Sequence, residues 1–176
     1  PEALFAAKLY EQIYGKPPPA PKQWDMVLHE QDGTHPLYTI NKSEKIVDVY
    51  LHQGQQRAWD SAKRFVFMLA GKQSGKTIYG PVHLHRWIRE FGAGDYLAIS
   101  ATNDLFIAKM LPALKQYFVN DLGIAKYWPG DRIFELCDPL TGKFGAGHGY
   151  EYEKMWGRII LRTAESEAGM QSFSAK

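Results

Sequence analysis

The sequence has little cysteine, little excess charge and no long apolar run. Its one cysteine, Cys137, cannot form an internal disulfide or a thiolate metal site alone, so we expect a buried hydrophobic side chain in a reducing compartment. The formal net charge is only +2, from 21 basic and 19 acidic residues, so any nucleic-acid contact must come from a local patch. The longest apolar run, 65–70, is far shorter than the roughly 20 residues that span a bilayer, and no signal pattern is present. We therefore predict a soluble protein without membrane contacts.

The 176 residues are 45% hydrophobic, enough to bury one core, which excludes disorder of the whole chain. Residues 1–50 predict a helix over 3–14, a proline-rich linker over 17–21 and weak extended segments at 37–40 and 46–51. Residues 51–176 form the main domain. Because the chain starts at Pro1 and its end carries no terminating signal, we expect a piece of a longer protein.

The main domain alternates short apolar runs with helical patterns. A helix is predicted over 55–63 with Trp59 and Ala62 inward, followed by a strand over 65–70 that is buried on both faces. Two further helices are predicted, over 77–91 and 103–118, and Gly80 and Pro81 should distort the start of the first. Three further strands are predicted: a buried one over 95–100, and two over 133–136 and 158–162. This order predicts an α/β fold in which helices flank a parallel sheet.

A phosphate-binding loop is the sharpest motif. It comprises Ala70, Gly71, Lys72, Gln73, Ser74, Gly75, Lys76 and Thr77, between the predicted strand and helix. Small residues let backbone N–H groups surround an anion, and the helix N-terminus adds partial positive charge. Lys76 is then expected to contact the β- and γ-phosphates of a nucleotide, and the Thr77 hydroxyl to ligate Mg²⁺. Ala70 stands where the motif G-x-x-x-x-G-K-[ST] has its first glycine.

A glutamine lies upstream of this loop, at the start of the helix that precedes the strand. A glutamine amide offers one donor and one acceptor, which match the edge of adenine. We favour Gln55 over Gln53 for this role, the alternative being a polar helix start.

Several segments together resemble the large terminase subunit of tailed bacteriophages. They are Leu51–Gln56, Arg64–Phe65, the loop Ala70–Thr77, Asp95–Thr102 and Gly157–Lys176. The resemblance covers roughly 51–176, with no clear counterpart for 1–50. It implies the first part of a P-loop NTPase domain of the additional-strand ATPase type.

The resemblance further implies a motor that hydrolyses ATP to pump double-stranded DNA through a portal protein into a prohead. Expected partners are the portal protein, the small terminase subunit and further copies in an oligomeric ring, in the host cytoplasm. A C-terminal nuclease would lie outside this chain. Lys72 would hold the basic loop position that is proposed to act on the γ-phosphate; lysine keeps the charge of the usual arginine but loses its bidentate fork.

Hydrolysis also needs an acidic pair at the end of an apolar strand, and the sequence has none. Glu135 and Asp138 are poor candidates because Glu135 interrupts an apolar run and Pro139 follows; Glu165 and Glu167 fit solvated loop charges. By resemblance, the acidic strand lies just beyond Lys176, so this chain is expected to bind nucleotide but hydrolyse it poorly.

Two alternatives stay open at this point: a helicase or translocase of another P-loop family, and a non-hydrolysing nucleotide-binding module. A histidine metal site is not expected, because His83 and His85 are two positions apart on a predicted helix and point to different faces.

Overall fold

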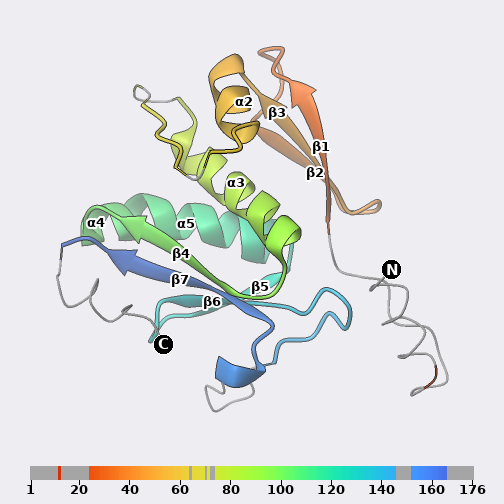
Figure 1. Cartoon of the computed structure of the whole chain (residues 1–176), viewed down its shortest axis with the longest axis vertical. Helices are drawn as coiled ribbons and strands as arrows, with labels where there is room; N and C mark the ends of the chain where they lie inside the picture. Colours follow the sequence, from red (N-terminus) through yellow and green to blue (C-terminus); the bar gives the residue numbers. More distant parts are fainter. Residues whose placement is uncertain are drawn as a thin grey trace.

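A computed structural model describes residue 12 and residues 24–63, 65–69, 71, 74–145 and 152–165. The described chain has an α/β fold with a three-stranded and a four-stranded sheet, both of mixed strand direction. Figure 1 shows the small sheet at one end, the large sheet at the other, and helix α3 between them. The predicted helix over 3–14, apart from Gln12, and the proline-rich linker lie outside the described residues.

The small sheet contains β1 (Asp25–Glu30), β2 (Tyr38–Asn41) and β3 (Ile46–Leu51) in the order β1-β3-β2. β3 alternates between buried and half-buried residues, as expected for a strand with one covered face. The extended segments predicted at 37–40 and 46–51 are confirmed. β1 was not predicted, because its apolar residues do not alternate with polar ones and its side chains are mostly exposed.

Two helices lead from the small sheet towards the large one. α2 (Gln53–Trp59) starts at a capping box, in which the His52 ring accepts from backbone N–H groups. The helix starts earlier than predicted and ends at Trp59; Trp59 is buried as expected, but Ala62 is exposed beyond the helix end. α3 (Lys76–Phe91) confirms the helix predicted over 77–91 and runs unbroken through Pro81.

The large sheet contains β4 (Asp95–Ser100), β5 (Ala125–Trp128), β6 (Ile133–Leu136) and β7 (Gly157–Thr163) in the order β4-β7-β6-β5. The strands predicted at 95–100, 133–136 and 158–162 are confirmed. The expectation of a parallel sheet is wrong beyond the pair β4 and β7, because β6 runs antiparallel to both of its neighbours. The short link 129–132 between β5 and β6 permits only an antiparallel hairpin.

One long helical segment connects β4 to β5 and confirms the helix predicted over 103–118, extending it to Asp121. It consists of α4 (Asn103–Leu105), η1 (Phe106–Met110), α5 (Leu111–Leu114) and η2 (Lys115–Asp121). η1 and η2 are π-helical and flank α5, which contains Pro112; proline has no amide hydrogen for the regular ladder. Four buried side chains, Phe106, Leu114, Tyr117 and Phe118, join the segment to the common hydrophobic core. Tyr117 meets Tyr38 of the small sheet and, with Phe118, His85 of α3.

The strand predicted over 65–70 is wrong for the residues that the structure describes. Residues 65–69 form no strand, and Phe65, Phe67 and Leu69 are 71%, 89% and 98% exposed. β4 is the edge strand of its sheet. Leu97 and Ile99 lie on the face of β4 that lines a groove, and both are half exposed rather than buried as predicted. An apolar run forms a strand only where a neighbouring strand takes up its backbone hydrogen bonds, and this requirement is not visible in local periodicity.

Candidate functional site

The end of the predicted phosphate loop forms the start of α3. Gly75 is the N-cap of the helix and has φ +77° and ψ 4°, a left-handed conformation that favours glycine. Its carbonyl oxygen accepts hydrogen bonds from the N–H groups of Ile78 and Tyr79, at 3.1 and 2.8 Å. The first N–H groups of a helix have no acceptor within the helix and carry partial positive charge. The left-handed glycine therefore marks the turn from the loop into α3, and the Lys76 and Thr77 N–H groups are the first of the helix.

Lys76 folds back over this loop. Its Nζ donates to the Gly71 carbonyl oxygen at 2.6 Å and to Ser74 Oγ at 3.0 Å, while Ser74 Oγ donates to the same carbonyl at 2.9 Å. Ammonium groups prefer charged oxygen acceptors to neutral ones. A phosphate oxygen within reach of Lys76 Nζ would therefore compete with these two neutral acceptors. Ala70, Lys72 and Gln73, also predicted for the site, lie outside the described residues.

The structure brings Gln55 to the loop, although it lies 20 residues upstream of Gly75. Gln55 is only 2% exposed, and a Cβ atom at Gly75 would lie 3.2 Å from Gln55 Nε2. The Gln55 Oε1 atom accepts from the His52 N–H at 3.2 Å as part of the capping box. The amide NH₂ group is therefore the part of the side chain that lies against the loop. Gln53, the other candidate, is exposed at the first position of the helix.

A groove of about 540 Å³ adjoins the start of α3. Lys76 and Thr77 line it from the helix, and Ser100 and Ala101 line it from the carboxyl end of β4. Its remaining walls are mainly apolar and come from α3, β4 and the helical segment after β4. Ligands of α/β proteins commonly bind at the carboxyl ends of parallel strands, so the position of the groove agrees with the predicted site.

The acidic residues considered for catalysis hold local structure. Glu135 is fully buried, and its Oε2 accepts from Trp128 Nε1 at 3.0 Å. Asp138 accepts from the Leu140 N–H at 2.8 Å and from the Thr141 hydroxyl at 2.9 Å.

Glu165 Oε2 accepts from the Asn103 N–H at 3.0 Å and thereby helps to cap α4, a role that the sequence does not indicate. Glu167 lies outside the described residues. Of the described residues that line the groove, none carries a carboxylate, and in the described part of the chain no group of three or more His, Cys, Asp or Glu residues is placed to hold a metal.

His83 and His85 lie in separate surroundings, in line with their spacing on α3. His85 is buried and its Nδ1 is 2.9 Å from Tyr117 Oη. Burial, with a smaller effect of the Arg89 guanidinium, lowers the pKa of His85 to about 3, so this ring is neutral at physiological pH. His83 instead lies between Tyr79 and Trp87 on the side of α3 that faces α2.

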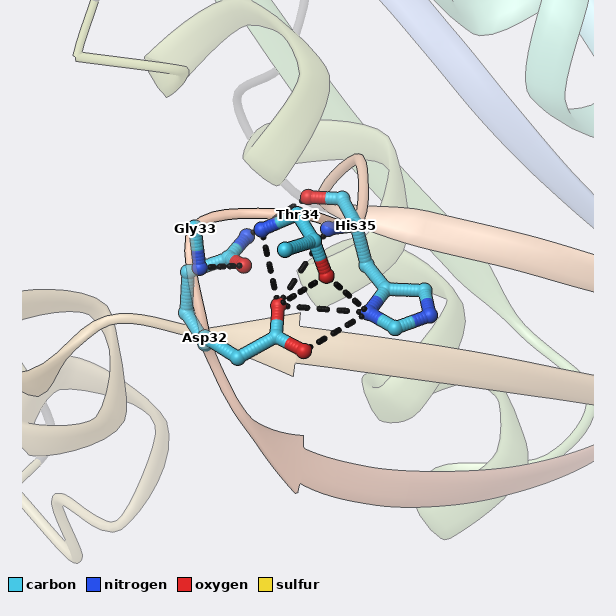
Figure 2. A network of polar contacts seen from close by, with 5 residues as sticks. Asp32, Gly33, Thr34 and His35 are labelled. Atoms are coloured by element: carbon cyan, nitrogen blue, oxygen red, sulfur yellow. Dashed lines mark hydrogen bonds and ion pairs between the residues drawn. The ribbon is translucent and has the colours of Figure 1, made fainter.

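A second polar cluster occupies the turn between β1 and β2 (Figure 2). The Asp32 carboxylate accepts from the Thr34 N–H at 2.9 Å, from the Thr34 hydroxyl at 2.8 Å and from the His35 N–H at 3.3 Å. These hydrogen bonds, the one from the Thr34 N–H foremost, hold the pKa of Asp32 well below its usual range. The cluster orders the turn, and its bonds would be lost only in strong acid, when the carboxylate becomes protonated.

Comparisons with protein families, with curated proteins and with solved structures found no match to this chain. Within the described residues, no helix combines the length and the apolar character needed to cross a bilayer.

Proposed function

We propose that this chain is the nucleotide-binding part of an ATPase domain in a motor of the terminase large subunit type, which translocates double-stranded DNA. One observation carries the proposal: left-handed Gly75 places Lys76 and Thr77 at the first two positions of α3, beside the groove. A helix start with a lysine and a hydroxyl in this order is suited to a triphosphate and its magnesium ion.

The residues present fit ATP and Mg²⁺ by their donor set. The N–H groups at the start of α3 and the Lys76 ammonium would hold the phosphates, and the Thr77 hydroxyl would ligate the metal. Gln55, whose amide NH₂ lies at the loop, would face the base. Bound Mg²⁺ offsets the negative charge on the phosphate oxygens. The chain's own contribution is to bind and orient the nucleotide.

The DNA-packaging part of the proposal rests on the resemblance of 51–176. Portal protein, small terminase subunit and further copies in a ring are the partners that it implies. The acidic pair for water activation belongs, on this proposal, to a strand beyond Lys176. With a net charge of only +2, the chain would contact DNA through local basic groups.

The first test compares Lys76→Ala with Lys42→Ala. Lys76→Ala removes the ammonium that lies in the loop and is expected to weaken binding of ATP with Mg²⁺ by about ten- to hundredfold, the usual effect of a lost hydrogen bond to a charged group. Lys42, exposed in the turn after β2, is the matched control and should leave the affinity unchanged. Isothermal titration calorimetry measures both. Equal affinities of the two variants would overturn the proposed site.

Turnover gives a second test. We expect slow release of phosphate from ATP by this chain and a further loss in Lys76→Ala, because the described groove has no carboxylate to activate water. A coupled phosphate-release assay measures both rates. Robust hydrolysis that persists in Lys76→Ala would contradict the proposal, since another group would then perform the chemistry.

A further inference from the structure

A chain of hydrogen bonds runs along α3 from Trp87 to Gln55. Trp87 Nε1 donates to His83 Nε2 at 2.9 Å, His83 Nδ1 is 3.2 Å from Tyr79 Oη, and Tyr79 Oη donates to the main-chain carbonyl oxygen of Gln55 at 3.4 Å. The three side chains recur at every fourth residue, so one face of the helix carries all of them. The sequence suggests His83 only as a metal candidate, because a helical spacing does not show which side chains bond to one another.

The direction of this chain follows from the donor inventory. The indole N–H of Trp87 is a donor only, so His83 Nε2 must be the accepting nitrogen. The neutral ring then carries its proton on Nδ1 and donates it to Tyr79 Oη, which leaves the Tyr79 hydroxyl hydrogen for Gln55.

Two pKa shifts agree with this assignment. Burial, with a smaller contribution from the Arg86 guanidinium, lowers the pKa of His83 to about 4 and keeps the ring neutral. Burial also raises the pKa of Tyr79 to about 12 and keeps its hydroxyl protonated. Both groups therefore hold the protonation states that the hydrogen bonds require over the whole physiological range.

Packing holds the same residues in place where the end of α2 meets α3. The rings of Tyr79 and His83 stack with centroids 5.2 Å apart, and Trp59 of α2 meets the His83 ring edge to face at 5.6 Å. Arg86 donates to the Trp59 carbonyl oxygen and lies over the Trp59 ring, 5.0 Å from its centroid. These contacts fix α2, and with it Gln55, against the helix that starts at the phosphate loop.

We propose that His83, as the Nδ1-protonated tautomer, is a positioning residue for base recognition. It orients Tyr79, whose hydroxyl holds the main chain of α2 at Gln55 and thereby keeps the Gln55 amide beside Gly75. This inference rests on the proposed function, in which Gln55 faces the base of the nucleotide. His83 itself lines neither the groove nor the loop, so its effect on the ligand passes through Tyr79 and Gln55.

The test compares His83→Phe with His83→Asn. Phenylalanine keeps an aromatic ring beside Tyr79 and Trp59 but removes both hydrogen bonds, whereas the asparagine amide can still donate to Tyr79 Oη. Affinities are measured for ATP, GTP and inorganic tripolyphosphate, each with Mg²⁺. His29→Phe is the matched control, because His29 lies on the small sheet and bonds to Asp48 there.

We expect His83→Phe to lower the preference for ATP over GTP by about three- to tenfold, the range of one hydrogen bond, with tripolyphosphate affinity unchanged. His83→Asn should restore most of the preference, and His29→Phe should keep all of it. If His83→Phe lowered the affinity for all three ligands equally, and His83→Asn did not restore it, His83 would have only a structural role and the inference would be overturned. Failure of the unmodified chain to bind any of the three ligands would instead overturn the proposed function, on which the inference rests.

A ligand-independent measurement tests the hydrogen bonds themselves. Long-range ¹H–¹⁵N spectra of the unmodified chain are expected to show His83 protonated at Nδ1, and the Trp87 indole N–H resonance should shift in His83→Phe. Protonation at Nε2 would contradict the proposed direction of the chain and overturn the inference even where nucleotide binding is intact.

Discussion

Gly75→Ala is expected to lower the affinity for ATP by at least about tenfold and the free energy of unfolding by about 1–2 kcal/mol. The energetic cost arises because φ at Gly75 is +77°, where a Cβ atom crowds the backbone. The loss of affinity has a separate cause: the new Cβ would lie 3.2 Å from Gln55 Nε2, so Gln55 or the loop must shift. Titration calorimetry and urea denaturation measure the two effects.

Gly33→Ala separates these two causes. Gly33 has a similar φ of +82° in the turn between β1 and β2, but a Cβ there meets nothing within 4 Å. We expect a comparable loss of stability with unchanged ATP affinity. If Gly75→Ala bound ATP as tightly as Gly33→Ala does, the contact between Gln55 and the loop would have no part in nucleotide binding.

Glu135→Ala is expected to lower the free energy of unfolding by about 3 kcal/mol or more, because it removes a buried carboxylate and leaves its donors behind. Glu135 is fully buried on β6 and accepts from Trp128 Nε1. In the strand register it stands between Lys126 of β5 and Arg158 of β7. Arg158 in turn forms an ion pair with Asp95 of β4, so charges alternate across the whole sheet.

Glu135→Gln tests whether the acceptor or the charge matters more. Glutamine keeps an oxygen for the Trp128 indole N–H, so we expect a loss closer to 1 kcal/mol, that of a weakened hydrogen bond. Glu44→Ala, in the exposed turn before β3, should change stability by less than about 0.5 kcal/mol. Urea denaturation of the three variants gives the comparison. A Glu135→Ala variant as stable as Glu44→Ala would show that the charge alternation across the sheet adds nothing to the fold.

Local patterns predicted much of the secondary structure. The helix at 76–91 and the strand at 95–100 follow from spacings of three to four and from short apolar runs, which involve only neighbours along the chain. Local patterns do not predict the antiparallel hairpin of β5 and β6, because the direction of a strand depends on which strands pair in space. The same reason explains why the apolar run 65–69 is not part of either described sheet.

The candidate site also has a part that the sequence predicts and a part that only the tertiary structure determines. The phosphate loop Ala70–Thr77 is a prediction from the sequence, because small residues followed by a lysine and a hydroxyl at fixed spacing are typical of such loops. The contact of Gln55 with Gly75, the hydrogen bonds through Tyr79 and His83, and the burial of Glu135 were decided only by tertiary structure. Each of these joins groups that lie apart in the sequence or on different elements, and local spacing carries no information about such distances.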